Sequence, residues 1–452
     1  MNKPTPPIYN SLKASAKQSY FKENNWVQFK KNKNAYYSYK ILLVIIAIAL
    51  LSPFIATDLP WYCNYRGVKM YPAFSLKNTS EIKNDSTNKI ERIQYDITDW
   101  KQLKAAKIIF APIPYSPNKA DYANSNYVSP TGVQKFILST GEKITMPFKF
   151  RHWLGTNKLG EDVLSGLLNG TCISLVVGIF SMAIASFIGI GLGALAGYFG
   201  NKKLRVTRGS FFSMAIGLLV AYYYAFYLRH YYLIDGLATS NLQFIKQLVL
   251  SGFIFFSILF LFYYLKKIIN KLYFFKKQIY FPVDAIILRV IEVLASFPLL
   301  ILIILMATML KEGSIMTIVF VIGFTFWVNI ARLTRAEFLK ITKLDYIQSA
   351  QAMGLKESQV IIKHALPNAL APVTVAIVFG VAAAILIESS LSFLGIGVAA
   401  DRVTWGSLLY SGREQFNAWW LVVFPGLALF TTLLIINFLA DGLRNVLDPK
   451  ED

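Results

Sequence analysis

Hydrophobic residues are concentrated in long uninterrupted runs, which are separated by short polar links and by one long polar segment. The runs cover approximately residues 41–57, 172–198, 209–228, 247–265, 284–309, 314–331, 369–394 and 418–441. Several of them reach the roughly 20 residues that an α-helix needs to cross a hydrocarbon layer of about 30 Å. The pattern predicts an all-α polytopic membrane protein with about eight spans.

Composition and charge support a membrane protein. Hydrophobic residues make up 55% of the 452-residue chain and charged residues only 16%, whereas a soluble domain carries about 25% charged residues. The net charge of +21 is compatible with either nucleic acid or anionic lipid as a partner. Because lysines and arginines gather in the links beside the apolar runs, we interpret them as orientation signals at membrane lipid and expect no nucleic-acid binding.

The basic residues alternate from link to link, which predicts the orientation of the spans. The N-terminal segment 1–40 has eight lysines and a single acid, Glu23, so we expect it in the cytoplasm, before a first transmembrane helix at 41–57. Three later links share this basic character: 202–208, 266–277 and 332–368. With eight spans, the C-terminus returns to the cytoplasm as well.

The long polar segment covers residues 58–170 and is mixed in charge and rich in proline. We expect it to be extracytoplasmic with its own partial structure, because loops of this length are translocated largely regardless of charge. A separate enzymatic or scaffolding role for residues 58–150 stays open. The two cysteines, Cys63 and Cys172, are too few for a disulfide framework, and whether they pair with each other also stays open.

The most informative link reads DYIQSAQAMGLKESQVIIKHALPN and runs from residue 345 to residue 368. Alanines favour a helix before Gly354, which can adopt the left-handed conformation that ends one, and Leu355 supplies the apolar contact that follows. Pro367 marks the next boundary. We predict a helix–turn–helix on the cytoplasmic face, whose small residues let another protein approach the backbone closely.

This stretch resembles the EAA loop of ABC importer permeases, which in that family forms the coupling helix that docks on the ATPase subunit. The resemblance implies ATPase-coupling roles for ten residues: Tyr346, Gln348, Ser349, Ala350, Ala352, Met353, Gly354, Leu355, Leu366 and Pro367. Gln348 stands where the family usually has Glu, and Ser349 where it has the first Ala. Gln348 lacks the charge for an ion pair but can still form hydrogen bonds. An ordinary loop between spans is the alternative.

A second motif, HWLGTNKLGEDVLS at 152–165, resembles a pattern of the dipeptide/oligopeptide/nickel branch of these permeases. Asn157 and Glu161 replace the usual Asp and Arg, so a charge pairing of the relatives is lost. Two glycines and Thr156 favour a tight turn, and Asp162 can begin a helix on the outer surface. We expect a fold-stabilising turn here and not a substrate site.

A third motif of the same branch, IESSLSFLGIG at 387–397, contains Glu388, the only acid deep in its span. A carboxylate inside a membrane is costly unless it faces water or a partner. The sequence leaves two roles open for Glu388, lining a gate or supporting the structure.

Several chemical signatures are missing from the sequence. It contains no G-x-x-x-x-G-K-[ST] phosphate-binding loop, so any ATP hydrolysis must come from other subunits. The three histidines are scattered and the cysteines lack metal-binding spacing, so we expect no metal and no cofactor. Since no nucleophile–base constellation is present either, we do not expect an enzyme.

Together, residues 152–205 and 282–450 resemble the second permease subunit of the dipeptide/oligopeptide branch. The resemblance implies a type I ABC importer transmembrane domain in a bacterial inner membrane that carries di- or oligopeptides. The implied partners are a second permease subunit, two ATPase subunits and an extracytoplasmic solute-binding protein. Transport of nickel or another small solute is the alternative. An ion-coupled secondary transporter is less favoured, because it would need internal repeats and intramembrane acids.

Compared with the six spans of that family, residues 206–282 are additional. We interpret them as an inserted two-helix transmembrane hairpin between core segments 171–205 and 283–452. The two apolar runs inside it are long enough to cross, and an even number of added spans keeps the coupling loop in the cytoplasm. A hairpin lying in the inner interface is the alternative.

Overall fold

The computed structural model describes residues 26–75, 77–83, 90–103, 105–138, 140–239, 241–309, 314–397 and 402–447. The predicted basic segment is thus described only from residue 26. The chain divides into two compact units, Met1–Gly193 with Val293–Asp452 and Ala194–Glu292. We call them the core unit and the hairpin unit and describe each by itself.

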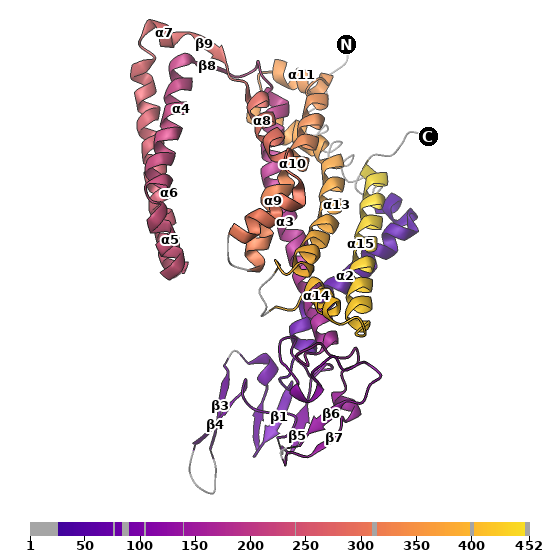
Figure 1. Cartoon of the computed structure of the whole chain (residues 1–452). Helices are drawn as coiled ribbons and strands as arrows, with labels where there is room; N and C mark the ends of the chain where they lie inside the picture. Colours follow the sequence, from indigo (N-terminus) through magenta and orange to yellow (C-terminus); the bar gives the residue numbers. More distant parts are fainter. Residues whose placement is uncertain are drawn as a thin grey trace. The chain divides into compact units, whose positions relative to one another are not determined.

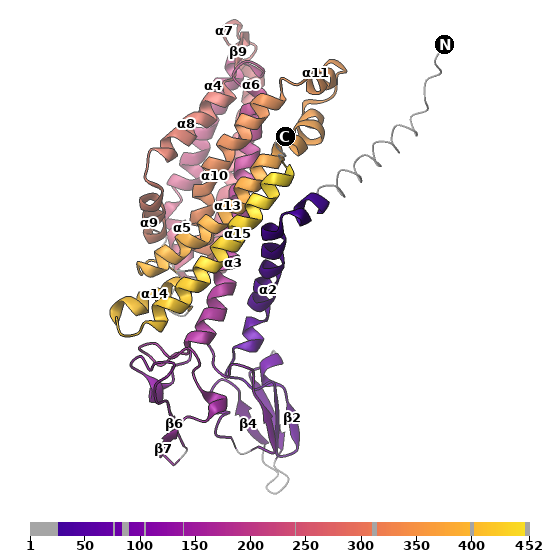
Figure 2. The same cartoon turned by 90° about the vertical axis from the view of Figure 1, so that its right-hand side faces the viewer.

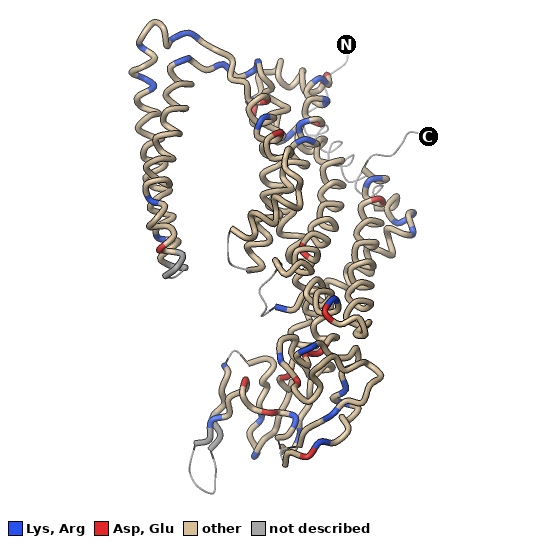
Figure 3. Tube along the Cα trace, viewed as in Figure 1, with Lys and Arg blue, Asp and Glu red and all other residues tan. Residues whose placement is uncertain are grey.

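Long apolar helices make up most of the core unit (Figure 1). They are α2 (Lys33–Ile55), α3 (Val163–Phe199, whose last turns belong to the hairpin unit), α9 (Leu299–Met309), α10 (Ile315–Ile341), α13 (Leu366–Phe393) and α15 (Trp420–Leu447). Helix α13 packs against both α10 and α15, and α15 also packs against α2. The tube in Figure 3 shows long uncharged stretches in these helices, as hydrocarbon surroundings require.

Seven helices in the described part of the chain are long and apolar enough to cross a membrane, or eight if one broken pair counts as a span. This confirms the predicted class and the approximate number of spans. The broken pair is a correction to the expected run 284–309: α8 (Val283–Ala295) ends before α9 begins. Pro298 immediately precedes α9, where its missing N–H and its ring interrupt a continuous helix.

Two helices begin earlier than the apolar runs indicate. Helix α2 starts at Lys33 and not at residue 41, and α3 starts at Val163 and not near residue 172. Residues 163–170 therefore belong to a core helix and not to the polar segment. Their serine, glycine and asparagine lower the apolar character of the run, but a side-chain cap by Asp162 starts the helix ahead of them.

Among the described residues between α2 and α3, seven short strands form a small domain, which we call the strand domain, so the all-α prediction does not hold for this segment. One antiparallel sheet has the order β2–β1–β5, with β1 (Tyr62–Tyr65), β2 (Val68–Met70) and β5 (Lys107–Ile109). Two hairpins join β3 (Thr79–Lys83) to β4 (Ile90–Gln94) and β6 (Lys135–Ile137) to β7 (Lys143–Thr145).

The strand domain has its own small hydrophobic core, which includes Cys63, Met70, Tyr95 and Trp100. Cys172 lies on α3 against a different cluster of side chains, and both cysteines are free thiols. The question of their pairing is thereby answered for this structure.

The strand domain and helix α11 (Asp345–Ala352) lie at opposite ends of α3, α13 and α15, as Figures 1 and 2 both show. Helix α14 (Trp405–Glu414) lies at the end nearer the strand domain, where Leu408 and Trp420 pack against Tyr127 and Leu154. The two motifs that the sequence singles out on either side of the core thus belong to opposite ends of one helical unit.

The hairpin unit is a two-helix hairpin closed by a small sheet. Strand β8 (Arg205–Thr207) pairs with β9 (Gln278–Tyr280) at its base. One arm consists of α4 (Arg208–Tyr222), a π-helical turn (Tyr223–Tyr227) and α5 (His230–Thr239), and the other of α6 (Asn241–Ile269), with α7 (Tyr273–Lys276) before β9.

Small residues explain why the two arms pack so closely. Every fourth position of the first arm is small and buried: Gly209, Ser213, Gly217, Ala221 and Ala225. A Cβ built on Gly217 would lie 2.8 Å from Phe262 of α6, so glycine is needed at this contact. Small residues at four-residue spacing are typical of helices that associate in membranes.

Candidate functional site

The stretch that resembles a coupling loop forms a short helix and a turn at one end of the core unit. Helix α10 ends at Ile341, α11 follows at Asp345–Ala352, and the chain becomes helical again at Glu357. This is the predicted helix–turn–helix. Its second helix is continuous with the membrane-crossing helix α13, which ties the turn directly to the core.

A left-handed glycine ends α11. Gly354 has φ of +77° and its N–H donates to the carbonyl of Gln351 at 3.0 Å. The N–H of Leu355 reaches back to the carbonyl of Ala350 at 3.3 Å. These two hydrogen bonds define a Schellman motif, so the sequence-based interpretation of Gly354 is confirmed.

Pro367 does not end a helix, contrary to the prediction. The helix that starts at Glu357 passes through a π-helical turn at Val360–Ala365 and continues past Pro367 to Phe393. Proline has no N–H to donate and its ring crowds the carbonyl four residues earlier. A wider π turn just before the proline accommodates this defect without breaking the helix.

The ten predicted coupling residues differ in exposure. Eight of them are exposed: Tyr346, Gln348, Ser349, Ala352, Met353, Gly354, Leu355 and Pro367. Ala350 is buried and Leu366 is half-buried, so these two support the loop from inside. Fully buried Ile347 and Val360 anchor the same inner face.

Four large apolar side chains on α11 and the turns that flank it are left uncovered within the described chain. They are Leu344, Tyr346, Met353 and Leu355, with exposed fractions of 43%, 42%, 74% and 37%. We call them the coupling patch. The sequence had not singled out Leu344, although its apolar side chain in a polar link was a usable signal.

Hydrogen bonds hold the patch in place. The amide of Asn368 donates to the Tyr346 hydroxyl at 2.9 Å, which joins α11 to α13. The amide of Gln348 donates to the Lys343 carbonyl at 3.1 Å. An ionised Glu at 348 could not donate this bond, so the departure from the family pattern has a local structural use.

The outer motif, residues 152–165, lies between the strand domain and the start of α3. His152 is fully buried, with Nδ1 2.8 Å from Asp162 Oδ1 and Nε2 3.2 Å from Asp121 Oδ2. Burial opposes protonation of His152, but the hydrogen bonds to the two aspartates outweigh it and raise its pKa. The motif therefore contains an imidazole clamped between two carboxylates.

The same motif starts α3. Oδ2 of Asp162 accepts the N–H of Ser165 at 2.7 Å, so Asp162 caps the core helix itself and not a separate surface helix. Asn157 donates to Glu161 at 2.7 Å, which replaces the charge pairing expected to be lost. Trp420 of α15 donates to the Thr156 carbonyl at 3.1 Å. These contacts describe a structural turn.

Glu388 is fully buried in α13. The hydroxyls of Ser174 on α3 and of Ser389 donate to its Oε2 at 3.3 and 3.2 Å, and that of Ser392 donates to Oε1 at 2.9 Å. Within this chain it therefore faces hydrogen-bond donors and not an open path. Of its two possible roles, this environment favours support of the α3–α13 contact.

One set of residues was missed at the sequence level. Lys101, Tyr115 and Asp121 meet in a cavity of the strand domain although they belong to different segments. No local motif connects them, so only the folded chain reveals the cavity.

A bundle of helices long and apolar enough to cross a membrane, with an exposed loop at one end and a strand domain at the other, is typical of a multi-pass membrane protein. Residues 277–452 match the family described as "binding-protein-dependent transport system inner membrane component". Residues 19–69 match the "N-terminal TM domain of oligopeptide transport permease C". The chain belongs to the ABC importer permeases, in the dipeptide/oligopeptide branch.

Three relatives illustrate the similarity. The chain is 25% identical to the inner membrane ABC transporter permease YejE of Escherichia coli K12, covering 94% of this chain and 96% of YejE. It is 26% identical to the dipeptide permease DppC of Bacillus subtilis, over 82% of this chain and 91% of DppC. It is 38% identical to the oligopeptide permease OppC of E. coli K12, but this match spans 37% of this chain and 56% of OppC.

Proposed function

We propose that this chain is a permease subunit that forms half of the translocation path for di- or oligopeptides in an ABC importer. The names of its relatives support peptides as the solute, since these include oligopeptide and dipeptide permeases. The match of its N-terminal region to the oligopeptide permease C type supports the same solute class.

The observation that carries the proposal is the coupling patch. Four apolar side chains stand exposed on a hydrogen-bonded loop, within the region that matches the permease family. Fully burying a side chain of this kind stabilises a contact by about 1.5–3 kcal/mol. Apolar anchors on a rigid support are what a stable protein–protein contact needs. The occupant that we propose is an ATPase subunit.

The remaining partners follow from this role. The importer would combine the chain with a second permease, two ATPases and an extracytoplasmic solute-binding protein, and the chain itself would not hydrolyse ATP. Both termini and the coupling patch would face the cytoplasm of a bacterial inner membrane. The strand domain, at the other end of the core helices, would then be extracytoplasmic.

We also propose that the hairpin unit crosses the membrane. Its first arm offers Arg208–Tyr227 and its second Gln243–Ile269 as candidate spans. The 29 residues of α6 extend about 43 Å at 1.5 Å per residue, more than a hydrocarbon layer of about 30 Å. The tip of the hairpin would therefore project beyond the membrane.

The test of the coupling patch is copurification of the ATPase subunits with the full-length permease. Met353→Glu places a charge at the most exposed patch position and should reduce ATPase recovery and peptide uptake at least tenfold. Val133→Glu is the matched control, because Val133 is 76% exposed but lies in the strand domain. Full ATPase recovery with Met353→Glu would refute the proposed docking surface.

A further inference from the structure

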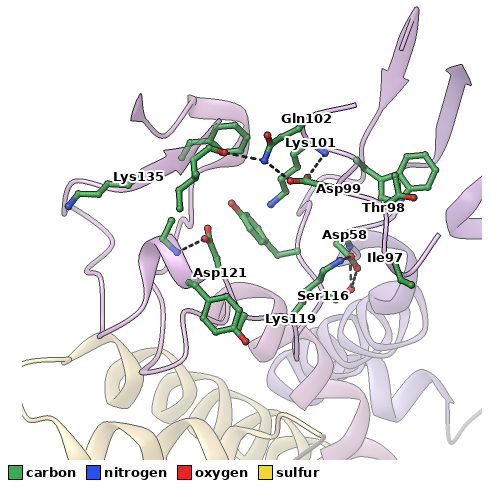
Figure 4. Close-up of a pocket in the computed structure, with 17 residues that line it drawn as sticks. Asp58, Ile97, Thr98, Asp99, Lys101, Gln102, Ser116, Lys119, Asp121 and Lys135 are labelled. Atoms are coloured by element: carbon green, nitrogen blue, oxygen red, sulfur yellow. Dashed lines mark hydrogen bonds and ion pairs between the residues drawn. The ribbon is translucent and has the colours of Figure 1, made fainter. Parts of the chain in front are cut away.

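The strand domain contains a cavity of about 370 Å³ that no part of the proposed transport function uses (Figure 4). Its charged lining comes from separate segments: the link between α2 and β1, the link between β4 and β5, the link between β5 and β6, and β6 itself. The volume lies in the range of small-molecule sites, about 300–1,000 Å³.

Lys101 is the unusual member of this lining. Its ammonium lies 3.3 Å from the centre of the Tyr115 ring, and within the described residues no hydrogen bond or ion pair to it is found. Burial lowers its pKa to about 8, against the pull of nearby aspartates, of which Asp121 contributes most. A half-buried ammonium without an acceptor is costly, and a ligand carboxylate would remove that cost.

Three carboxylates share the cavity with Lys101, and each is held in place by other groups. Asp58 accepts from Lys119 at 2.5 Å, Asp99 from the Gln102 amide at 2.6 Å, and Asp121 from the Asn124 amide at 2.8 Å. A carboxylate has about four acceptor sites, so these bonds orient the groups and leave acceptor capacity over.

The charges in the lining balance. Three aspartates (Asp58, Asp99 and Asp121) face three lysines (Lys101, Lys119 and Lys135). In Figure 4, Lys101 and Asp121 reach into the cavity from different sides. A simple anion would be attracted by the Lys101 ammonium but repelled by the three aspartate carboxylates. A ligand that carries a positive and a negative charge at separate ends can pair with both kinds of group.

We propose that this cavity binds a small zwitterion, a free amino acid or a very short peptide, with its carboxylate on Lys101 and its ammonium among the aspartates. The Tyr115 ring forms the floor beneath Lys101 and is itself buried. All lining residues lie in the segment between α2 and α3, outside the membrane-crossing helices. The site therefore goes beyond the transport function and does not depend on which solute the importer carries.

The site is also connected to the core helices. Asp121, in the lining, contacts the buried His152, which contacts Asp162, and Asp162 caps the first turn of α3. A ligand ammonium at Asp121 would compete with His152 for the same carboxylate. A ligand in the cavity is therefore linked to the start of α3 through the buried side chain of His152.

Saturation-transfer NMR on the full-length permease in lipid nanodiscs tests the site, with dialanine as the probe. N-acetylalanine, which lacks the ammonium, and alaninamide, which lacks the carboxylate, should each bind at least tenfold more weakly than dialanine. This comparison uses only the natural protein. Equal binding of all three compounds, or no saturable dialanine signal, would overturn the proposal.

A pair of variants locates the binding. Lys101→Met keeps an unbranched side chain over Tyr115 but removes the charge, and should weaken dialanine binding at least tenfold. Lys143→Met is the control, because Lys143 is an exposed strand residue that does not line the cavity. Equal dialanine binding in both variants would refute the site.

Two further outcomes separate this inference from other functions. If dialanine fails to bind while Lys101→Met weakens capture of the solute-binding protein, the cavity is a protein contact and the zwitterion site is wrong. Peptide uptake by the complex is measured in parallel. If uptake is normal but dialanine does not bind, the cavity proposal is wrong and the transport proposal stands. If uptake is lost but dialanine binding is normal and depends on Lys101, the cavity proposal stands and only the transport proposal is contradicted.

Discussion

The outer motif at residues 152–165 and the coupling segment at residues 344–368 look alike as sequences but have opposite environments. Both combine left-handed glycines with small and polar residues at the end of a core helix. In the outer motif, His152 and Thr156 are fully buried and bonded to the strand domain. In the coupling segment, eight of the ten motif residues are exposed.

Their glycines show the difference most clearly. A Cβ on Gly160 would lie 2.1 Å from the carbonyl oxygen of Asp121, whereas a Cβ on Gly354 would meet nothing within 4 Å. Both residues have positive φ, of +86° and +77°. The outer motif is thus completed by this chain, while the space beside Gly354 is left open by the described residues, as the proposed docking of an ATPase subunit requires.

The largest expected effect is that of Gly160→Ala. The added Cβ combines a backbone clash with left-handed strain, so we expect a loss of about 3 kcal/mol or more, seen as poor yield and a lower apparent Tm. Gly141→Ala is the control, since Gly141 also has positive φ, +83°, but open space around it. It should cost about 1–2 kcal/mol. Equal Tm values for the two variants would remove the distinction between crowded and open glycines.

Removing the acceptor at Glu388 should have the next largest effect. Glu388→Ala leaves three buried serine hydroxyls without their acceptor and should lower stability by about 1–3 kcal/mol. Glu388→Gln keeps the shape and one acceptor oxygen, so we expect nearly normal Tm and peptide uptake. Normal Tm but abolished uptake in Glu388→Gln would instead assign the carboxylate to a gate.

Gly354→Asp should separate folding from coupling. Because the space around Gly354 is open and aspartate tolerates left-handed φ better than most residues, the permease should fold with nearly normal Tm. ATPase copurification should fall about tenfold, since the new side chain and charge stand beside Met353 and Leu355. Gly141→Asp, at a matching open glycine of the strand domain, should leave ATPase recovery unchanged. A similar loss in both variants would argue against a specific docking turn.

The clamp around His152 predicts a pH dependence. Since the folded-state pKa of His152 is raised above its unfolded value near 6.5, its stabilising contribution is complete below pH 6.5 and is lost as pH rises through the folded pKa. The contribution of Lys101 changes with pH in the opposite direction. Its folded-state pKa is lowered to about 8, so the free energy of unfolding increases as the pH rises from about 8 towards the unfolded-state pKa of 10.5.

Thermal unfolding of the full-length permease across pH 6–8 measures the His152 contribution. We expect the apparent Tm of the natural protein to fall by about 2–4 °C for each kcal/mol lost. His152→Gln should flatten this slope, whatever its Tm at the lower pH. An unchanged slope in that variant would mean that His152 is not protonated in the folded protein.

The smallest effect on stability is expected from cysteine variants that test the topology, because these should leave the Tm unchanged. In a background without Cys63 and Cys172, Tyr231→Cys on α5 should react with an impermeant thiol reagent from outside, because Tyr231 is 75% exposed beyond the first candidate span. Ser349→Cys on the coupling segment should react only from the cytoplasmic side. Labelling of both from the cytoplasm alone would place the hairpin in the inner interface.

Much of the helical architecture was predictable, because hydrophobic run length and helix capping are local properties. The apolar runs gave the spans to within several residues, and the Gly354 turn followed from the order of alanine, glycine and leucine. The errors are also local in origin. Pro367 predicted a helix boundary, but a π turn before it lets the helix continue. Helix α3 begins earlier than predicted because Asp162 caps it, and a polar cap does not appear in a hydropathy pattern.

The sequence by itself thus determined the membrane class, the helix–turn–helix within residues 345–368 and the additional hairpin, since each depends on residues close together in the chain. Only the tertiary structure decided what surrounds each motif. Glu388 meets Ser174, 214 residues away, and Lys101 meets Asp121 and Asp58 only in the folded strand domain. Burial and hydrogen-bond partners are properties of long-range contacts, and those contacts distinguish the buried outer motif from the open coupling segment.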